Sequence, residues 1–250
     1  MHKNERKREI ISILKNNDGF VSVKELCSTL FASESSIRRD LTTLENRGII
    51  KRTYGGAELL TNFSNVVTFE KRAHHNTDAK KIIAKKAANL ISDGNVIFLD
   101  QSSTSYYLAN EIINRPSLTV VTNNIEILGL LSTSKIKTFS SGGYLSTENR
   151  SCLVGTDAMQ IFDNIYADMV FFSTKSISDD GIISDCAREE VLVRDAMLKN
   201  SAKKIFLCDS EKFTTHSPYK QCTLRDIDIL ICENNSSARF SGRFENLEIL

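Results

Sequence analysis

From Asp78 onward, short apolar runs alternate with longer segments of helical periodicity, and this alternation limits the fold more than any other feature of the chain. The apolar runs are NVIFLD, SLTVVTN, KIKTFSS, ADMVFFST, KKIFLCDS and DIDILIC. Strands that are apolar on both faces are typical of a parallel sheet covered by helices on each side. Residues 78–250 are therefore predicted to form an α/β domain with a doubly covered, mostly parallel sheet.

Polar side chains follow five of these runs, at the point where each predicted strand ends. Ligands of open parallel sheets bind beyond the carboxyl ends of the strands, so these side chains are candidates for a binding site. Residues 102–104 also open a helix, where free backbone N–H groups and the helix dipole favour an anion. We expect a phosphate there, with Lys175 or Lys212 supplying positive charge, and with Asp100 and two asparagines bonding to sugar hydroxyls. The candidate residues are Asp100, Ser102, Ser103, Thr104, Thr122, Asn123, Asn124, Gly142, Gly143, Lys175 and Lys212.

A simpler interpretation holds for each strand end taken alone. Hydroxyl and Asn residues after strands commonly cap the next helix, and Gly142 and Gly143 could serve only a tight turn. Recurrence of the pattern at five strand ends favours a composite binding site over capping alone.

The positive charge of the chain is concentrated at its start. The net charge is only +1, but residues 1–56 contain 11 Lys and Arg against 7 Asp and Glu, a net charge of +4, which leaves −3 for the remainder. The distribution of charge matters more than its total for contact with nucleic acid, and the basic excess lies at the front.

A helix predicted to begin after Ser33 and to end at Gly48 carries an apolar stripe of Ile37, Leu41 and Leu44. At 100° per residue, the opposite side and its flanks are polar. Arg side chains on such a face can bond in pairs to guanine O6 and N7, and Ser, Thr and Asn can bond to base edges and phosphates. The alternative is a solvated helix face with two arginines. The polar residues are Ser35, Ser36, Arg38, Arg39, Thr42, Thr43 and Asn46.

The segment IIKRTYGGAEL, residues 49–59, reads as two short strands around a turn that contains Gly55 and Gly56. A basic hairpin directly after a recognition helix can place Lys51, Arg52 and Tyr54 on the DNA backbone or in the minor groove. The alternative is a hairpin that only closes the small domain.

The run SSIRRDLTTLENRGIIKRTYGGAEL resembles the winged helix-turn-helix domain of the DeoR family of bacterial transcriptional regulators, whose signature is IRRDL followed by a wing ending in GGA. The resemblance covers residues 5–59. It implies that the recognition helix and the wing contact operator DNA through Ser35, Ser36, Arg38, Arg39, Thr42, Arg52 and Tyr54.

The segments FLDQSST, VVTNN, SSGG, ADMVFFS followed by DGI, and FLCDSEKF resemble the C-terminal sensor domain of the same family. The resemblance runs from about residue 78 to residue 233. It implies a fold similar to ribose-5-phosphate isomerase and glucosamine-6-phosphate deaminase, with a phosphorylated sugar or related metabolite as effector in the strand-end site. Many family members have a glycine-containing loop after ADMVFF, whereas this chain has STKSIS, so Lys175 is expected to narrow the site or to add a charge.

The same sequence patterns predict the domain boundaries and argue against a metal-binding, secreted or membrane protein. We predict a winged helix-turn-helix domain over residues 1–58, a linker over residues 59–77 and the effector-sensing domain over residues 78–250. The six cysteines contain no CxxC pair, so neither a zinc site nor a disulfide framework is indicated, and no cofactor is expected. No run approaches the roughly 18 apolar residues of a membrane span, and the start of the chain does not read as a signal peptide, so we expect a cytoplasmic protein.

The leading hypothesis is a DNA-binding repressor of a carbohydrate-use operon, controlled by a phosphorylated sugar. A homodimer or higher homo-oligomer is expected, because helix-turn-helix proteins place two recognition helices on two half-sites. The alternative is a sugar-phosphate isomerase or deaminase with an appended DNA-binding domain, for which Asp100 and Asp209 are the candidate bases. The acid-rich catalytic loop and catalytic His of those enzymes have no evident counterpart in FFSTKSISDDG. A third hypothesis is an architectural DNA binder with an inert α/β domain.

Overall fold

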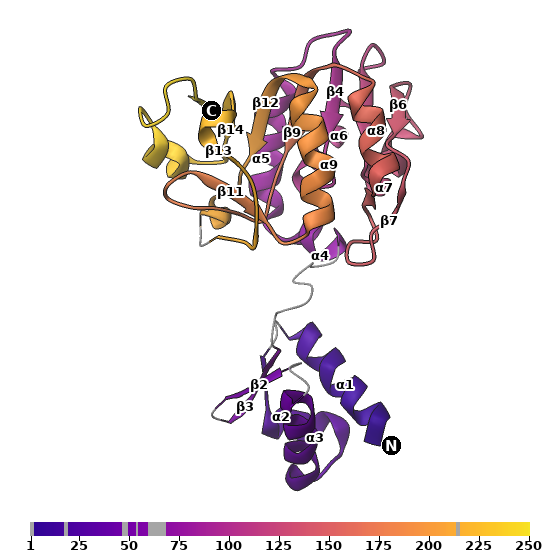
Figure 1. The fold of residues 1–250 in the computed structure, drawn as a ribbon, viewed down its shortest axis with the longest axis vertical. Helices are drawn as coiled ribbons and strands as arrows, with labels where there is room; N and C mark the ends of the chain where they lie inside the picture. Colours follow the sequence, from indigo (N-terminus) through magenta and orange to yellow (C-terminus); the bar gives the residue numbers. More distant parts are fainter. Residues whose placement is uncertain (1–2, 18–19, 47–49, 54, 60–68, 214–215) are drawn as a thin grey trace. The chain divides into compact units, whose positions relative to one another are not determined.

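A computed structural model describes residues 3–17, 20–46, 50–53, 55–59, 69–213 and 216–250 (Figure 1). The chain divides into two compact units, Met1–Asn65 and Val66–Leu250. The boundary between the units falls inside the predicted linker of residues 59–77, of which residues 60–68 lie outside the described part.

The first unit combines three helices with a three-stranded antiparallel sheet of order β1-β3-β2. Its core includes Ile10, Leu26 and Ile37, all fully buried, so each helix contributes one apolar face. The elements are α1 Lys3–Asn16, β1 Phe20–Ser22, α2 Val23–Leu30, α3 Glu34–Asn46, β2 Ile50–Thr53 and β3 Gly56–Leu59.

Two local features shape this unit. The Ser22 hydroxyl accepts a hydrogen bond from the Glu25 amide at 3.1 Å and so caps the start of α2. Strand β3 lies so close to β1 that a Cβ atom on Gly56 would be 2.6 Å from the Val21 carbonyl oxygen. The second glycine of the predicted hairpin is therefore required by packing.

The second unit is built on a seven-stranded sheet of order β15-β14-β12-β9-β4-β5-β6, in which every neighbouring pair is parallel. This arrangement confirms the predicted parallel sheet. The strands are β4 Val96–Leu99, β5 Thr119–Thr122, β6 Lys137–Ser140, β9 Ala167–Phe172, β12 Ser201–Leu207, β14 Ile229–Ile231 and β15 Glu248–Ile249.

Helices cover both faces of the sheet, as Figure 1 shows. Phe98 of β4 packs on one face, edge to face with Phe162 at a ring distance of 5.0 Å, whereas Ile97 and Leu99 join the core on the other face. Side chains of β4 therefore belong to the cores on both faces of the sheet. Burying one side chain of this size contributes about 1.5–3 kcal/mol. The first face carries α8 Thr156–Asp163 and α9 Arg188–Lys199, and the second carries α5 Thr77–Ala88, α6 Ser103–Ile112 and α7 Ile125–Leu131.

Several smaller elements were not predicted from the sequence, because segments of two to five residues give too little periodicity to detect. A hairpin of β7 and β8 follows β6, and an antiparallel sheet of order β10-β11-β13 lies beside the main sheet. The bounds are β7 Tyr144–Leu145, β8 Leu153–Val154, β10 Ser176–Ile177, β11 Ile182–Asp185 and β13 Tyr219–Thr223, with 3-10 turns η1 Ser210–Lys212, η2 Leu224–Asp226 and η3 Asn235–Phe240.

A short helix, α4 Phe69–His74, occupies part of the predicted linker. Phe69 is buried and meets the Tyr106 ring edge to face at 5.5 Å, so α4 packs on α6 of the second unit. Within the described residues, no helix is both long enough and apolar enough to cross a membrane.

Candidate functional site

Helix α3 buries the predicted apolar stripe and exposes the predicted polar face. Ile37, Leu41 and Leu44 are at most 1% exposed, whereas Arg38 and Arg39 are exposed. The helical periodicity therefore assigned the two faces of α3 correctly. Contact of the polar face with DNA stays a prediction.

Weak exposed contacts occupy most of the predicted DNA-binding side chains. Arg38 pairs with Glu34 at 2.7 Å, and Arg52 of β2 donates a hydrogen bond to the Thr42 hydroxyl at 3.0 Å, which joins the hairpin to α3. The Ser33 hydroxyl bonds to those of Ser35 and Ser36. Exposed pairs of this kind contribute at most about 1 kcal/mol, so phosphates and base edges can replace them at small cost.

Two of the predicted DNA contacts differ from this pattern. The guanidinium of Arg39 is exposed and has no hydrogen-bond partner among the described residues. Tyr54 lies outside the described residues. The structure therefore leaves the Arg39 guanidinium without a competing contact among the described residues, and its contact with a base stays a prediction.

Asp40, the acidic residue of IRRDL, has an internal role that the sequence analysis missed. Its carboxylate is 2.6 Å from Arg6 Nε of α1 and its side chain is 3% exposed. The buried ion pair holds α3 against α1. The sequence feature that could have indicated this role is the position of Asp40 between Ile37 and Leu41, on the buried side of α3.

In the second unit, the structure brings together the polar ends of β4 and β5. The Thr122 hydroxyl donates to the Leu99 carbonyl at 2.7 Å, and the amide of Asn124 lies 3.5 Å from the Ser102 carbonyl. The side-chain oxygen of Asn124 also accepts from the amides of Glu126 and Ile127 in the first turn of α7, which is the capping role expected of a single strand end. The seven candidates here are at most 7% exposed, namely Asp100, Ser102, Ser103, Thr104, Thr122, Asn123 and Asn124.

Asp100 is the internal anchor of this cluster. One carboxylate oxygen accepts from the Ser105 hydroxyl at 2.7 Å and from the Ser102 amide at 3.1 Å. The other accepts from the Ser173 amide at 3.2 Å and from Arg194 Nε at 3.1 Å. A sugar hydroxyl would have to displace one of these partners, so the contacts favour a positioning role for Asp100 over the expected bond to the sugar.

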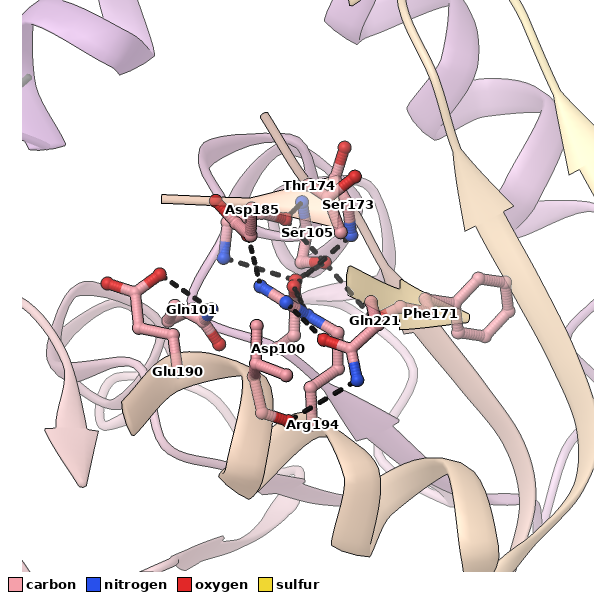
Figure 2. Close-up of polar contacts among 12 residues, drawn as sticks. Asp100, Gln101, Ser105, Phe171, Ser173, Thr174, Asp185, Glu190, Arg194 and Gln221 are labelled. Atoms are coloured by element: carbon pink, nitrogen blue, oxygen red, sulfur yellow. Dashed lines mark hydrogen bonds and ion pairs between the residues drawn. The ribbon is translucent and has the colours of Figure 1, made fainter. Parts of the chain in front are cut away.

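Arg194 of α9 connects the strand ends to the smaller sheet (Figure 2). It is 1% exposed, and its guanidinium contacts Asp100, Asp185 of β11 at 3.0 Å, and Gln221 of β13 at 2.6 Å. Burial alone would lower the pKa of Arg194, but the carboxylates of Asp185 and Asp100 outweigh it and raise the pKa. Arg194 therefore stays charged in the interior.

Glu190, one turn before Arg194, is a second buried carboxyl group. It accepts from Gln101 at 2.9 Å and from Asn149 at 2.8 Å. Burial and the negative charge of Asp185 raise the pKa of Glu190, whereas the bond from Asn149 opposes that rise. Neither Glu190 nor Arg194 was predicted from the sequence, because a helical position alone does not show which charged residues face the interior.

A group of cations lies at the end of β12. Lys212 of η1 donates a hydrogen bond to the Ser173 hydroxyl and is 3.5 Å from Asp209. Lys80 of α5, absent from the predicted set, is 4% exposed and donates to the carbonyls of Arg72 and His75. Burial, followed by the charge of Lys212, lowers the pKa of Lys80 to about 8.

The remaining candidates are explained by other features. Gly142 and Gly143 have φ values of +71° and +87°, and a Cβ atom on Gly143 would be 2.4 Å from the Val154 carbonyl oxygen. The turn into β7 alone therefore requires both glycines. Lys175 is exposed. Burial raises the pKa of the Cys186 thiol, and the nearby charge of Lys175 reduces that rise without cancelling it. Nothing in these contacts brings Lys175 to the cations at the end of β12.

Two family models match this chain. The DeoR-like helix-turn-helix domain matches residues 6–63, and the DeoR C terminal sensor domain matches residues 75–234. Together they span both compact units.

Several relatives match almost the whole chain. The HTH-type transcriptional regulator GolR of Listeria innocua is 32% identical over 243 residues, which cover 97% of this chain and 95% of GolR. The HTH-type transcriptional repressor GlcR of Bacillus subtilis is 30% identical and covers 96% of this chain and 92% of GlcR. The lactose phosphotransferase system repressor of Staphylococcus epidermidis is 30% identical, with 94% of each chain covered.

Among solved structures, ribose 5-phosphate isomerase A of Methanocaldococcus jannaschii is similar with a TM-score of 0.43 and 19% identity, covering 56% of this chain and 55% of the isomerase. The translation initiation factor eIF-2B of Pyrococcus horikoshii has a TM-score of 0.46 and 13% identity, covering 93% and 82%. TM-scores at this level transfer no activity.

Replacing Arg194 with Leu should destabilise the second unit strongly. The change leaves Asp100 and Asp185 buried without their cation, which typically costs about 3–5 kcal/mol. Urea unfolding followed by tyrosine fluorescence measures the loss, because every tyrosine except Tyr54 lies in the second unit. Arg188→Leu, at an exposed position of the same helix, is the control and should change stability by less than about 0.5 kcal/mol. Equal effects of the two substitutions would contradict the anchoring role.

The lowered pKa of Lys80 predicts a pH-dependent contribution to stability. Between the folded pKa of about 8 and the ordinary value of 10.5, the unfolded chain binds more protons at this group than the folded chain does. Stability contributed by Lys80 should therefore rise as the pH increases through this window. Urea unfolding of the wild type and of Lys80→Met at pH 7.5 and 9.5 measures this contribution, because the two proteins share all other titratable groups. The free energy of unfolding of the wild type, relative to that of Lys80→Met, should be larger at pH 9.5 than at pH 7.5. A difference between the two proteins that does not depend on pH would refute the assignment.

Proposed function

Because the chain belongs to the DeoR family of helix-turn-helix transcriptional regulators, we propose that it represses a carbohydrate-use operon and that a phosphorylated sugar bound in the second unit controls its affinity for operator DNA. The observation that carries the sensory part is the gathering of Lys80, the half-buried Lys212 and several buried hydroxyl groups near the carboxyl ends of the parallel strands. The names of the relatives support the carbohydrate part, since one of them is a lactose phosphotransferase system repressor.

The DNA contacts of this proposal come from α3 and the β2-β3 hairpin. Arg39 reads a base edge, whereas Arg38, Thr42 and Arg52 exchange their weak contacts with one another and with Glu34 for contacts to phosphate. Ser35 and Ser36 lie in the first turn of α3, where the helix dipole favours a phosphate. Tyr54 completes the proposed set.

The effector contacts come from the strand ends. Lys212, with Lys80 beside it, supplies positive charge for a phosphate, and the first turn of α6 supplies amides and the hydroxyls of Ser103 and Thr104. Asn123 supplies an amide group for sugar hydroxyls. Asp100, with its four internal partners, acts by holding the loop in place.

The same contacts disfavour an isomerase or deaminase activity. A base must be free to take a proton, and both oxygens of Asp100 are already occupied. Burial would raise the pKa of Asp209, but the charges of Lys212 and Lys80 outweigh it and hold the pKa below its ordinary value. A carboxylate of lowered pKa is a weak base, so a sensory role fits the site better.

Regulation follows from a difference in effector affinity between two states of the repressor. Two half-sites are needed for high operator affinity, so we propose that the repressor acts as a homodimer or a higher homo-oligomer in the cytoplasm, where its operator is located.

Replacing Arg39 with Ala should weaken operator binding by about 1–3 kcal/mol per half-site, which is the usual value of a bidentate contact to a base. Binding to random DNA should weaken much less, because that binding depends on phosphate contacts. Fluorescence anisotropy with an operator fragment and a scrambled fragment measures both. Arg8→Ala removes an exposed charge from α1 and serves as the control. A uniform loss on both DNA fragments would reassign Arg39 to the phosphate backbone.

A phosphorylated sugar should stabilise the second unit, by about 2.7 kcal/mol when its concentration is 100 times its Kd. A thermal-shift screen of sugar phosphates, with the unphosphorylated sugars in parallel, measures this effect. Ser103→Ala and Lys212→Ala should reduce the shift, whereas Lys203→Ala, an exposed position near the start of β12, should leave it unchanged. A shift that persists in the first two variants places the effector elsewhere.

A further inference from the structure

Phe31, in the turn between α2 and α3, combines two features that the fold of the first unit does not require. Its backbone lies in the left-handed region, with a φ of 48° and a ψ of 43°. Its side chain is 96% exposed, so the ring has almost no contact with the rest of the protein. A bulky side chain disfavours this backbone conformation, and an exposed aromatic ring gains nothing from burial. Two unfavourable features therefore meet at one residue.

The other residue with this backbone conformation has an evident structural explanation. Among the residues that the structure describes, only Phe31 and Asn76 have a positive φ without being glycine. Asparagine is one of the few residues that tolerate the left-handed region, and the Asn76 amide donates a hydrogen bond to Asp209 at 3.3 Å. The ring of Phe31 has no group that could form such a bond. Its conformation is therefore not explained by a contact of its side chain.

The turn itself uses only the backbone of Phe31. The amides of Phe31 and Ala32 both donate to the Cys27 carbonyl, which ends α2. Glycine is the usual residue at a left-handed helix end, and it would form the same hydrogen bonds with less strain. The ring is thus not needed for the turn. Residues that break a local rule in this way are expected mainly at functional sites, so the exposed ring points to a binding role.

The position of Phe31 in the first unit indicates the partner. Only Ala32 and Ser33 separate it from α3, whose first turn carries Ser35 and Ser36. In helix-turn-helix proteins, the first helix crosses the DNA backbone and the start of the second helix contacts base edges in the major groove. A side chain at the corner between these two helices therefore lies next to the DNA when α3 occupies the groove.

The chemistry of a phenyl ring selects one group of the major groove. Phenylalanine has no donor or acceptor, so it cannot bond to a phosphate or to the polar edge of a base. The methyl group of thymine is the apolar group that the major groove presents, and Phe side chains contact it favourably. We propose that Phe31 packs its ring against a thymine methyl group beside the bases that α3 reads, and so makes thymine the preferred base at one position of each half-site. This inference rests on the proposed contact of α3 with operator DNA and adds to it a specificity residue outside the recognition helix.

A scan that replaces thymine with uracil tests the contact, because uracil lacks only the methyl group. Selection from a random double-stranded DNA library with the full-length wild type defines an operator, and each of its thymines is then replaced singly. Fluorescence anisotropy should show that one replacement per half-site weakens binding by the wild type about fourfold, the effect expected for one buried methyl group. Phe31→Gly should bind the unmodified operator more weakly than the wild type does, and the same replacement should not weaken its binding further.

Further variants separate a DNA contact from a role in folding. Phe31→Asn suits the left-handed backbone and removes the ring, so it should behave like Phe31→Gly, whereas Phe31→Leu should keep part of the uracil effect. Glu9→Gln, at an exposed position of α1, should keep the whole wild-type pattern. Amide hydrogen exchange in α3 should be at most about twofold faster in Phe31→Gly, because the strain relieved at the turn offsets the extra freedom of glycine in the unfolded chain. A larger increase would show that the ring supports the small core, and would overturn the assignment.

The outcomes distinguish failure of this inference from failure of the proposed function. If every uracil replacement has the same effect on the wild type and on Phe31→Gly, the role of Phe31 falls, and operator recognition by α3 stands as long as Arg39→Ala loses affinity for the selected operator. If Phe31→Gly keeps the wild-type affinity and changes only the oligomeric state measured by sedimentation, the ring belongs to an interface between copies of the chain, and the role in DNA recognition falls. If the wild type selects no sequence from the library, both proposals fall.

Discussion

The buried contact of Arg194 with Asp100 and Asp185 is the interaction on which the second unit depends. It joins α9, the end of β4 and the smaller antiparallel sheet at a point where Arg194 and Asp100 are removed from water and Asp185 is largely buried. Burial of such charges is tolerated only when every one of them is paired, and here Asp100 accepts three further hydrogen bonds, from Ser102, Ser105 and Ser173. The shape of the loop after β4 is thus set by an arginine on the other side of the sheet.

Charge at the strand ends is distributed unevenly, with paired carboxylates on one side and an excess of positive charge on the other. The carboxylates of Asp100 and Asp185 are matched by Arg194 in the interior. Lys80 and Lys212, toward the end of β12, share Asp209, and their mutual repulsion contributes to the lowered pKa of Lys80. An anion bound on this side would relieve that repulsion, which is consistent with the proposed sensory role.

Polar residues of helix α3 in the first unit have two different roles, one inside the small core and one on the exposed face. Asp40 is buried against Arg6 and fixes α3 in the small core, whereas Arg38, Arg39 and Thr42 remain on the exposed side. The exposed contacts are weak individually and exchangeable, so the rigid position of the helix comes from its apolar stripe and from the Arg6–Asp40 pair. The proposed recognition of DNA therefore depends on a face whose orientation is set by buried residues.

The parallel sheet, the exposed and buried faces of α3, and the polar residues after the strands could all be predicted from the sequence. Each follows from local periodicity or from the rule that parallel strands end at one edge of the sheet. Which of those polar residues are internal depends on contacts between distant parts of the folded chain. Asp100 was predicted to bind the ligand, but its carboxylate is paired with Arg194, which is 94 residues away in the sequence. No local pattern marked Lys80. Pairing and burial of charge depend on contacts between distant elements, and these contacts exist only in the folded chain.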